Sequence, residues 1–228
     1  MDCCEWLEEI SRGLKELVEW ADDVLARRDE AREELIRLSR EIIRESGYVV
    51  TAVHRGDSGA VNNHLGRLKE LFNMLMTKLN DVPELRHTGL IYNAESEYVE
   101  ALVFYSIVME SRIPSKDELG SDPVPTLQGL LDVVGELKRY VLDLIKIGRL
   151  KEAEALASVA EGIYEALKPL DYPDALAPGI RRKVDVARMS TESLKSLLAE
   201  VSVRDALVKE LRKTRDLLES VIKGEDQR

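Results

Sequence analysis

The sequence predicts an all-α protein, folded as a single-domain antiparallel bundle of about seven helices. Apolar residues recur at intervals of three and four along most of the 228 residues, which is the spacing of one buried helix side. Hydrophobic residues make up 44% of the chain but aromatic residues only 5%. This balance is typical of helical bundles whose cores are built from Leu, Val, Ile and Ala. No segment alternates apolar and polar residues as a half-buried strand would.

Glycine and proline set the bounds of the first two predicted helices. Residues 5–53 keep the helical spacing throughout and predict one very long helix or two in sequence. The segment 55–59 ends this region, because its two glycines flank Asp and Ser and supply turn residues without helix support. The second helix covers about 61–80, and Pro83 breaks it.

The third predicted helix is the most apolar, so we expect it at the centre of the bundle. It starts near Glu84 and reaches about Ser111, and residues 98–109 are apolar on almost every side. A connection punctuated by prolines, 113–125, follows it. Within this connection, Ser115 is a candidate N-cap for a single turn of helix.

Four further helices complete the predicted bundle. A long helix starts at Thr126 or at the preceding proline and stops at Gly148. The remaining three cover about 149–168, 180–203 and 205–222. The last of them is a separate amphipathic piece.

The length of the chain and the composition of its ends indicate the number of domains and the cellular compartment. We expect one domain, residues 1–223, followed by a disordered tail, 224–228. The only cysteines, Cys3 and Cys4, are too few and too terminal to staple a fold, which fits a reducing compartment, although they could form a labile bridge between chains. The N-terminus is acidic and no run of about 18 apolar residues occurs. We therefore expect a cytoplasmic protein that does not enter membranes.

A pair of glutamates stands out in the most apolar predicted helix. Glu97 and Glu100 are three residues apart, so they project from neighbouring turns on the same side. Two anions at the edge of an apolar helix are costly, because each is desolvated and each raises the pKa of the other. A cation is expected between them. An arginine of a neighbouring helix is the simpler candidate, and a divalent metal ion is the alternative.

A second acidic pair lies on the fourth long helix. Asp132 and Glu136 are four residues apart on one side, opposite the apolar face. The spacing favours an ordinary solvated polar face. Gly129 and Gly135 border this stripe, and glycine inside an exposed helix costs about 1 kcal/mol relative to alanine. Both glycines would be explained if another backbone or a bulky ligand came close to the helix.

Together the two pairs would supply four carboxylates if their helices lie side by side. Two Mg²⁺ or Mn²⁺ ions held in this way could bridge a phosphodiester, activate a water molecule and stabilise the leaving oxygen. This chemistry needs no nucleophilic side chain. None is indicated, because the sequence has no nucleophile-elbow, Cys-His, P-loop or dinucleotide-binding pattern.

The charge balance requires any nucleic acid to meet a local basic patch or a metal ion. The chain has 33 basic and 43 acidic residues and a net charge of −10, so as a whole it repels polyanions. Arg37, Arg40 and Arg44 share one side of the first helical region and could follow a phosphate backbone. Glu41 and Glu45 stand beside them and favour the alternative, a salt-bridged solvent face.

A second basic group, Arg86 and His87, lies about three turns before Glu97 on the same predicted helix. At a helix start, this histidine is better suited to a cap or a phosphate contact than to metal ligation. The three histidines of the chain are too dispersed in sequence to suggest a zinc site. Aromatic residues are not interleaved with the basic ones, so base recognition by stacking is not expected.

Several segments, in order, resemble the translin family and particularly its catalytic branch, translin-associated factor X. The segments 38–42 (LSREI) and 53–55 (VHR) look like the family's first-helix signature, and 97–101 (EYVEA) matches a family segment of that sequence. The segment 131–137 (LDVVGEL) resembles its Asp-x-x-Gly-Glu-Leu pattern, and 180–204 is similar to its last helix. The likeness covers most of the chain.

This resemblance implies a seven-helix bundle of the translin type, assembly into a hollow octamer-like shell, and metal-dependent endoribonuclease activity. By the same resemblance, Glu97, Glu100, Asp132 and Glu136 are the catalytic residues and the ligands of Mg²⁺ or Mn²⁺. The expected partners are RNA, with single-stranded DNA as a second candidate, and further copies of the chain in a closed homo-oligomer. The sequence departs from the family in a helix after Arg204 that has no family counterpart.

Two other functions stay open on the sequence. The chain could be a non-catalytic translin-like protein that binds RNA or DNA, with structural carboxylates. It could also be an all-α nucleotide pyrophosphohydrolase, since such bundles bind Mg²⁺ through a Glu-x-x-Glu and a second acidic pair. Their second motif reads Glu-x-x-Asp, whereas this chain has Asp132 and Glu136 four residues apart.

Overall fold

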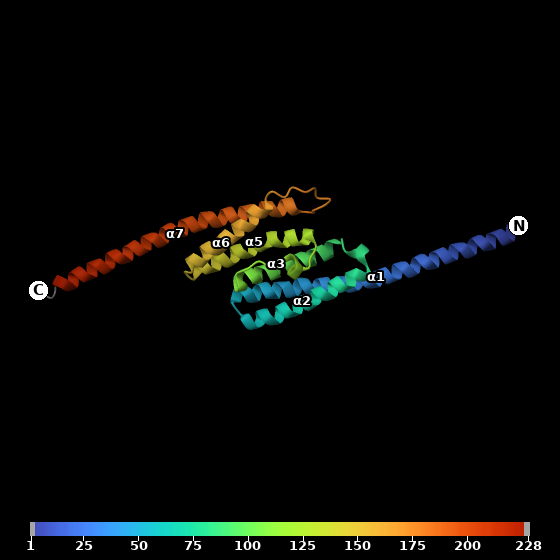
Figure 1. Cartoon of the computed structure of the whole chain (residues 1–228), viewed down its shortest axis with the longest axis horizontal. Helices are drawn as coiled ribbons and strands as arrows, with labels where there is room; N and C mark the ends of the chain where they lie inside the picture. Colours follow the sequence, from blue (N-terminus) through green and yellow to red (C-terminus); the bar gives the residue numbers. More distant parts are fainter. Residues whose placement is uncertain (1–2, 226–228) are drawn as a thin grey trace. The chain divides into compact units, whose positions relative to one another are not determined.

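The computed structural model describes residues 3–225, and every regular element in that range is a helix (Figure 1). The described range contains seven α-helices and one short 3₁₀ helix, which confirms the all-α prediction. The described residues form two compact units, which divide between Gly129 and Leu130. The proposed single domain, 1–223, stays a prediction.

The first unit is built around α1, Cys3–Arg55, a single helix of 53 residues. It packs along α2, Ser58–Asp81, and along α3, Gly89–Glu110 (Figure 1). Gly56, at a φ of +66°, takes the left-handed conformation that ends α1. The Asp57 side chain then caps α2 by accepting a hydrogen bond of 3.0 Å from the backbone amide of Ala60.

The third helix begins later than the sequence predicts. Pro83–Leu85 forms the 3₁₀ helix η1, and α3 starts only at Gly89 rather than near Glu84. The 3₁₀ turn has Pro83 at its start, where a missing amide hydrogen is tolerated, and Thr88 then adopts an extended conformation that separates the two helices. Most of α3 is buried, as expected for the most apolar helix of the chain.

The proline-punctuated connection contains the short helix α4, Lys116–Leu119, where a single turn is predicted. Ser115 and Glu118 form a reciprocal capping box at its start. The next helix, α5, Pro123–Lys146, begins a few residues earlier than predicted. Proline is readily accommodated in a first helical turn, because the amide it lacks would have no partner there.

The second unit consists of the rest of α5 together with α6, Leu150–Leu167, and α7, Ile180–Glu225. Gly148, at a φ of +78°, supplies the turn between α5 and α6. The α6 helix packs against α7. The predicted break between 203 and 205 is wrong, since α7 is continuous. The sequence there contains neither glycine nor proline, and the intrahelical ion pairs Arg204–Glu200 and Lys209–Asp205 span the region.

The chain ends are helical as far as they are described. The tail predicted for 224–228 overlaps the last two residues of α7, and 226–228 lie outside the described residues. Cys4 is an exposed free thiol, whereas the side chain of Cys3 lies outside the described part of the structure. None of the described helices is long and apolar enough to cross a lipid bilayer.

Candidate metal and nucleic-acid site

The glutamates Glu97 and Glu100 lie on α3 at the edge of the core of the first unit. Both are half-buried, whereas Tyr98 and Val99 between them are buried. The Tyr98 ring stacks on Phe72 of α2 with a centroid distance of 3.7 Å, which fixes this part of α3 against α2. Burial raises the pKa of the Tyr98 hydroxyl to about 12, so it stays neutral. The acidic pair is therefore carried by a rigid, packed segment.

The start of α5 approaches the same segment of α3. A Cβ atom on Gly129 would lie 2.6 Å from the carbonyl oxygen of Ser96 and 2.8 Å from the Cβ atom of Val99. Only glycine allows this contact, as predicted for a close backbone approach. At Gly135 an added Cβ atom would meet nothing within 4 Å, so that glycine has no such cause. Ser96 and Val99 are the neighbours in sequence of Glu97 and Glu100, and α5 crosses α3 beside this acidic pair.

A third glutamate, Glu95, holds this crossing together, and the sequence reasoning missed it. Its side chain is fully buried. It accepts hydrogen bonds from the Ser121 hydroxyl at 2.9 Å and from the backbone amide of Asp122 at 3.0 Å. Burial raises the pKa of the Glu95 carboxyl, and these two hydrogen bonds oppose the rise. The only signal in the sequence is a further carboxylate inside the most apolar helix.

Arg86 reinforces the same connection. Its guanidinium donates two hydrogen bonds to Asp122, of 2.6 Å from Nε and 2.8 Å from Nη2. Such a bidentate pair is strong and directional. Arg86 was predicted as a nucleic-acid contact, and the structure gives it a structural partner in addition. His87 is exposed, and its Nδ1 atom lies 2.8 Å from the Tyr92 hydroxyl.

The second acidic pair lies on α5 within the second unit. The side chains of Asp132 and Glu136 are 32% and 23% exposed, so neither is fully solvated. Asp132 forms an ion pair with Lys183 from the first turns of α7. Glu136 lies 3.5 Å from the guanidinium of Arg139 on the next turn. A cation already stands at each of these carboxylates.

The donor chemistry of the four predicted ligands fits Mg²⁺ or Mn²⁺, since half-buried carboxylate oxygens are the hard ligands these ions take. Each unit supplies one pair, Glu97 and Glu100 in the first and Asp132 and Glu136 in the second. Among the described residues of either unit, no group of three or more His, Cys, Asp or Glu side chains is placed to hold a metal ion. The convergence of the two pairs on shared ions stays a prediction.

The three arginines of the predicted basic patch on α1 differ in their surroundings. Arg37 is 3.2 Å from Glu41, as the salt-bridged alternative predicts. Arg40 and Arg44 are exposed and form no ion pair with any described residue. These two side chains are therefore the more available for a phosphate.

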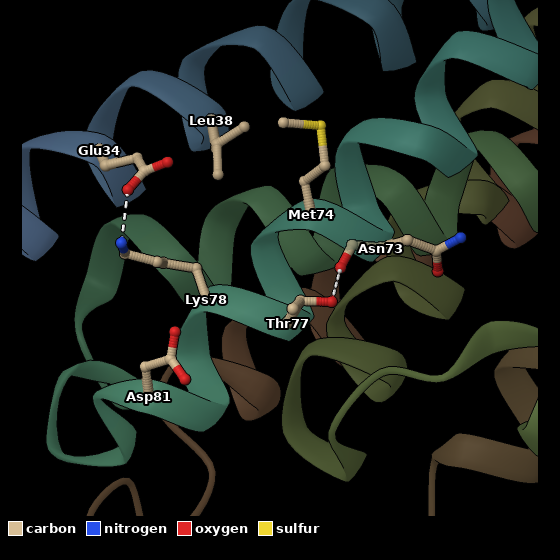
Figure 2. Close-up of a pocket in the computed structure, with 7 residues that line it drawn as sticks. All are labelled: Glu34, Leu38, Asn73, Met74, Thr77, Lys78 and Asp81. Atoms are coloured by element: carbon tan, nitrogen blue, oxygen red, sulfur yellow. Dashed lines mark hydrogen bonds and ion pairs between the residues drawn. The ribbon is translucent and has the colours of Figure 1, made fainter.

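A groove of about 350 Å³ lies between α1 and α2 (Figure 2). Lys78 reaches across it to Glu34 at 2.7 Å, and Asp81 lies beside them (Figure 2). The Glu34 carboxylate raises the pKa of the Lys78 ammonium. None of the predicted site residues lines this groove, and its cation is already neutralised. We therefore do not place the site there.

The chain is similar to known proteins over most of its length. A model of the Translin family matches residues 30–205. An uncharacterized protein of Methanocaldococcus jannaschii is 35% identical over 166 residues, which are 72% of this chain and 73% of that protein.

Solved structures extend the similarity to the fold. The structure of an AfC3PO–duplex RNA complex is 32% identical and superposes with a TM-score of 0.72 over 87% of this chain and 97% of that one. The crystal structure of apo-NeC3PO is 25% identical, with a TM-score of 0.71 over 82% of this chain and 96% of that one.

Proposed function

The chain belongs to the translin family, and from that premise we propose that it binds RNA and hydrolyses its phosphodiester bonds. In this proposal, carboxylates hold Mg²⁺ or Mn²⁺ inside a closed homo-oligomer such as an octamer. The observation that carries the proposal is the crossing of α5 over α3 at Gly129, directly beside Glu97 and Glu100.

RNA binding is supported by a relative and by the surface of α1. AfC3PO, 32% identical to this chain, forms a complex with duplex RNA. The net charge of −10 opposes binding to any polyanion unless cations are concentrated locally. Arg40 and Arg44 provide two exposed cations that are not neutralised by a described neighbour. Single-stranded DNA presents the same phosphates and is the second candidate ligand.

The shared metal site is supported by the family match. The segments 97–101 and 131–137, which carry the two acidic pairs, both resemble translin-family segments and lie within the matched residues 30–205. Asp132 and Glu136 are four residues apart and occupy one side of α5. We assign Glu97, Glu100, Asp132 and Glu136 to one site on this basis.

Each side chain then has a defined task in hydrolysis. Divalent ions, when bound, would supply the positive charge that orients the phosphodiester and acidifies the attacking water. Glu97 and Glu100 hold their positions because Tyr98 and Val99 between them are packed in the core. Lys183 forms an ion pair with Asp132, and a divalent ion would compete with this lysine for the carboxylate. No nucleophilic side chain takes part.

The test is cleavage of a short labelled RNA with and without Mg²⁺ or Mn²⁺, using Glu100→Gln and Asp132→Asn. Both substitutions keep the side-chain shape and remove one ligand charge. We expect each to abolish metal-dependent cleavage while light scattering still gives the assembled mass, which for an octamer is eight times 25.8 kDa. Asp143→Asn is the matched control, because Asp143 lies on the same helix, is 48% exposed and pairs with Lys146. Full activity in both site variants would exclude the proposed site.

The same assay separates the other two functions. RNA that is bound but never cleaved, with any divalent ion, would identify a non-catalytic binding protein. Metal-dependent hydrolysis of nucleoside triphosphates without cleavage of RNA would identify a nucleotide pyrophosphohydrolase.

A further inference from the structure

The first half of α1 carries an exposed apolar stripe. We define residues 3–25 as the N-terminal arm. Leu7, Ile10, Leu14 and Leu17 follow at intervals of three and four and are 47–63% exposed. Contiguous exposed apolar surface of this kind marks a site of association.

This stripe continues a buried one. Leu35, Leu38 and Ile42 stand 28 residues, or four heptads, after Leu7, Ile10 and Leu14. The three later residues are buried where α1 packs against α2 and α3. The pattern that packs α1 into the core thus runs on into the N-terminal arm, where its residues are exposed. A helix with this repeat is suited to a further helical partner.

The end of α7 carries a second exposed stripe. We define residues 203–219 as the C-terminal arm. Val203, Leu207, Leu211 and Leu218 share one side of the helix at intervals of four, four and seven, and each is at least 60% exposed. The match to the translin family spans residues 30–205. Both arms therefore lie almost wholly outside the residues that the family model matches.

The charges of the two arms differ in sign. The N-terminal arm has seven acidic and two basic residues, a net charge of −5, whereas the C-terminal arm has five basic and four acidic residues, a net charge of +1. Pairing of two N-terminal arms would bring like charges together, which disfavours it. Pairing of an N-terminal arm with a C-terminal arm brings opposite net charges together and covers both apolar stripes.

We propose that the N-terminal arm of one copy of this chain pairs with the C-terminal arm of a second copy as a coiled coil. The contact is head-to-tail, because it joins two different surfaces. Contacts of this kind join copies into rings or into open chains, according to the rotation between neighbouring copies. This pairing does not depend on RNA cleavage, so its failure and the failure of the proposed function are separate results.

The test exchanges the charges of the arms in the full-length chain. The N-arm variant is Glu8→Lys, Glu16→Lys and Asp22→Lys, and the C-arm variant replaces Lys209, Arg212 and Lys213 by Glu. All six positions are exposed, so the packed core is not altered, and circular dichroism checks that the helices remain. In either single-arm variant, the N-terminal and the C-terminal arm have net charges of the same sign. A chain that carries all six substitutions has arms of opposite sign again.

The readout is tryptophan fluorescence, since the only two tryptophans of the chain, Trp6 and Trp20, both lie in the N-terminal arm. They are 49% and 67% exposed in a single chain. In the wild-type protein we expect blue-shifted emission and protection from acrylamide quenching, both of which increase with protein concentration. Either single-arm variant should lose the shift and the protection, and the chain with both sets should regain them.

Co-expression of the two single-arm variants identifies the partner as a second copy. Only pairing between chains restores opposite charges in that mixture, so the emission should return to the wild-type position. Restoration in the doubly changed chain without restoration in the mixture would show pairing within one chain and overturn the proposal. The proposal would also be overturned if the N-arm variant changed the tryptophan emission and the C-arm variant did not. It would likewise be overturned if acrylamide fully quenched the tryptophans of the assembled wild-type protein.

Discussion

Gly129 of α5 lies so close to Val99 of α3 that an added Cβ atom would be 2.8 Å from the Cβ atom of the valine. Side chains normally keep helix axes 8–10 Å apart, and glycine at the contact permits the lower end of that range. The contact lies next to Glu100 in sequence and three residues before Asp132. A change in the distance between the two helices at this contact would therefore move the backbone that carries Glu100.

Replacement of Gly129 by alanine should destabilise the protein by about 1–3 kcal/mol, because the new methyl group meets the backbone oxygen of Ser96 and must displace it. Gly135→Ala is the matched control. Its methyl group meets nothing within 4 Å, so it should stabilise the helix by about 0.5–1 kcal/mol. Urea unfolding followed by circular dichroism measures both. Equal effects of the two substitutions would contradict the close contact.

The raised pKa of the Glu95 carboxyl predicts a pH dependence of stability. The folded protein binds this proton more tightly than the unfolded chain, whose carboxyl has a pKa of about 4.5. The free energy of unfolding contributed by Glu95 should therefore fall as pH rises from about 4.5 through the raised pKa, and then level off. Glu95→Gln should remove this slope and be at least as stable at pH 7, since an amide oxygen can still accept both hydrogen bonds.

Glu95→Ala is the contrasting variant. It leaves the Asp122 amide and the Ser121 hydroxyl without their acceptor and should cost about 2 kcal/mol or more. Thermal unfolding between pH 4 and pH 8 compares it with wild type and with Glu95→Gln. An unchanged pH profile in the glutamine variant would show that Glu95 does not titrate in this range.

The Arg86–Asp122 pair should contribute a coupling energy of about 1 kcal/mol, because its two hydrogen bonds are directional and both side chains are at least two-thirds buried. A double-mutant cycle with Arg86→Ala and Asp122→Ala, measured by urea unfolding, gives this energy. Arg28 and Glu84 form an exposed pair at 2.9 Å and serve as the control cycle, where we expect less. A coupling energy near zero for Arg86 and Asp122 would show that this pair does not stabilise the fold.

Loss of Lys183 should favour metal binding under the proposed function. Lys183 and a divalent ion would both draw on the carboxylate of Asp132, so Lys183→Met should lower the Mg²⁺ concentration that gives half-maximal cleavage. The change should reach about fivefold at most, since an ion pair whose side chains are 33% and 32% exposed contributes about 1 kcal/mol. Arg182→Met removes the same charge from an exposed neighbour and should leave this concentration unchanged. A higher Mg²⁺ requirement in Lys183→Met would show that the lysine supports the site instead.

The exposed arginines of α1 should contribute to RNA affinity through phosphate contacts. Arg40→Gln and Arg44→Gln should each weaken RNA binding and reduce the slope of log affinity against log salt by about 1. Arg37→Gln should have the smaller effect, because Glu41 already neutralises Arg37 at 3.2 Å. Fluorescence anisotropy of a labelled RNA at several salt concentrations measures the three slopes. If all three variants kept the wild-type salt dependence of RNA affinity, the RNA would not contact these arginines of α1.

Local patterns predicted most of the helices, and their errors have local physical causes. The sequence left open one helix or two before Arg55, and α1 is continuous, because residues 14–46 contain neither glycine nor proline. The start of α3 was misplaced by a few residues because a 3₁₀ turn after Pro83 has the same apolar spacing as a helix start. The break predicted before Asp205 does not occur, because residues 200–209 contain neither glycine nor proline.

The sequence by itself determined the helical class, the two acidic pairs and the family, since periodicity, turn residues and ordered motifs are all properties of neighbouring residues. Only the tertiary structure decided that Gly129 meets the backbone of α3 while Gly135 meets nothing. It likewise decided that Glu95 is buried against residues 26 and 27 positions further along the chain. Such contacts depend on how helices distant in sequence pack, and burial changes the energetics of a carboxylate in a way that spacing along one helix does not encode.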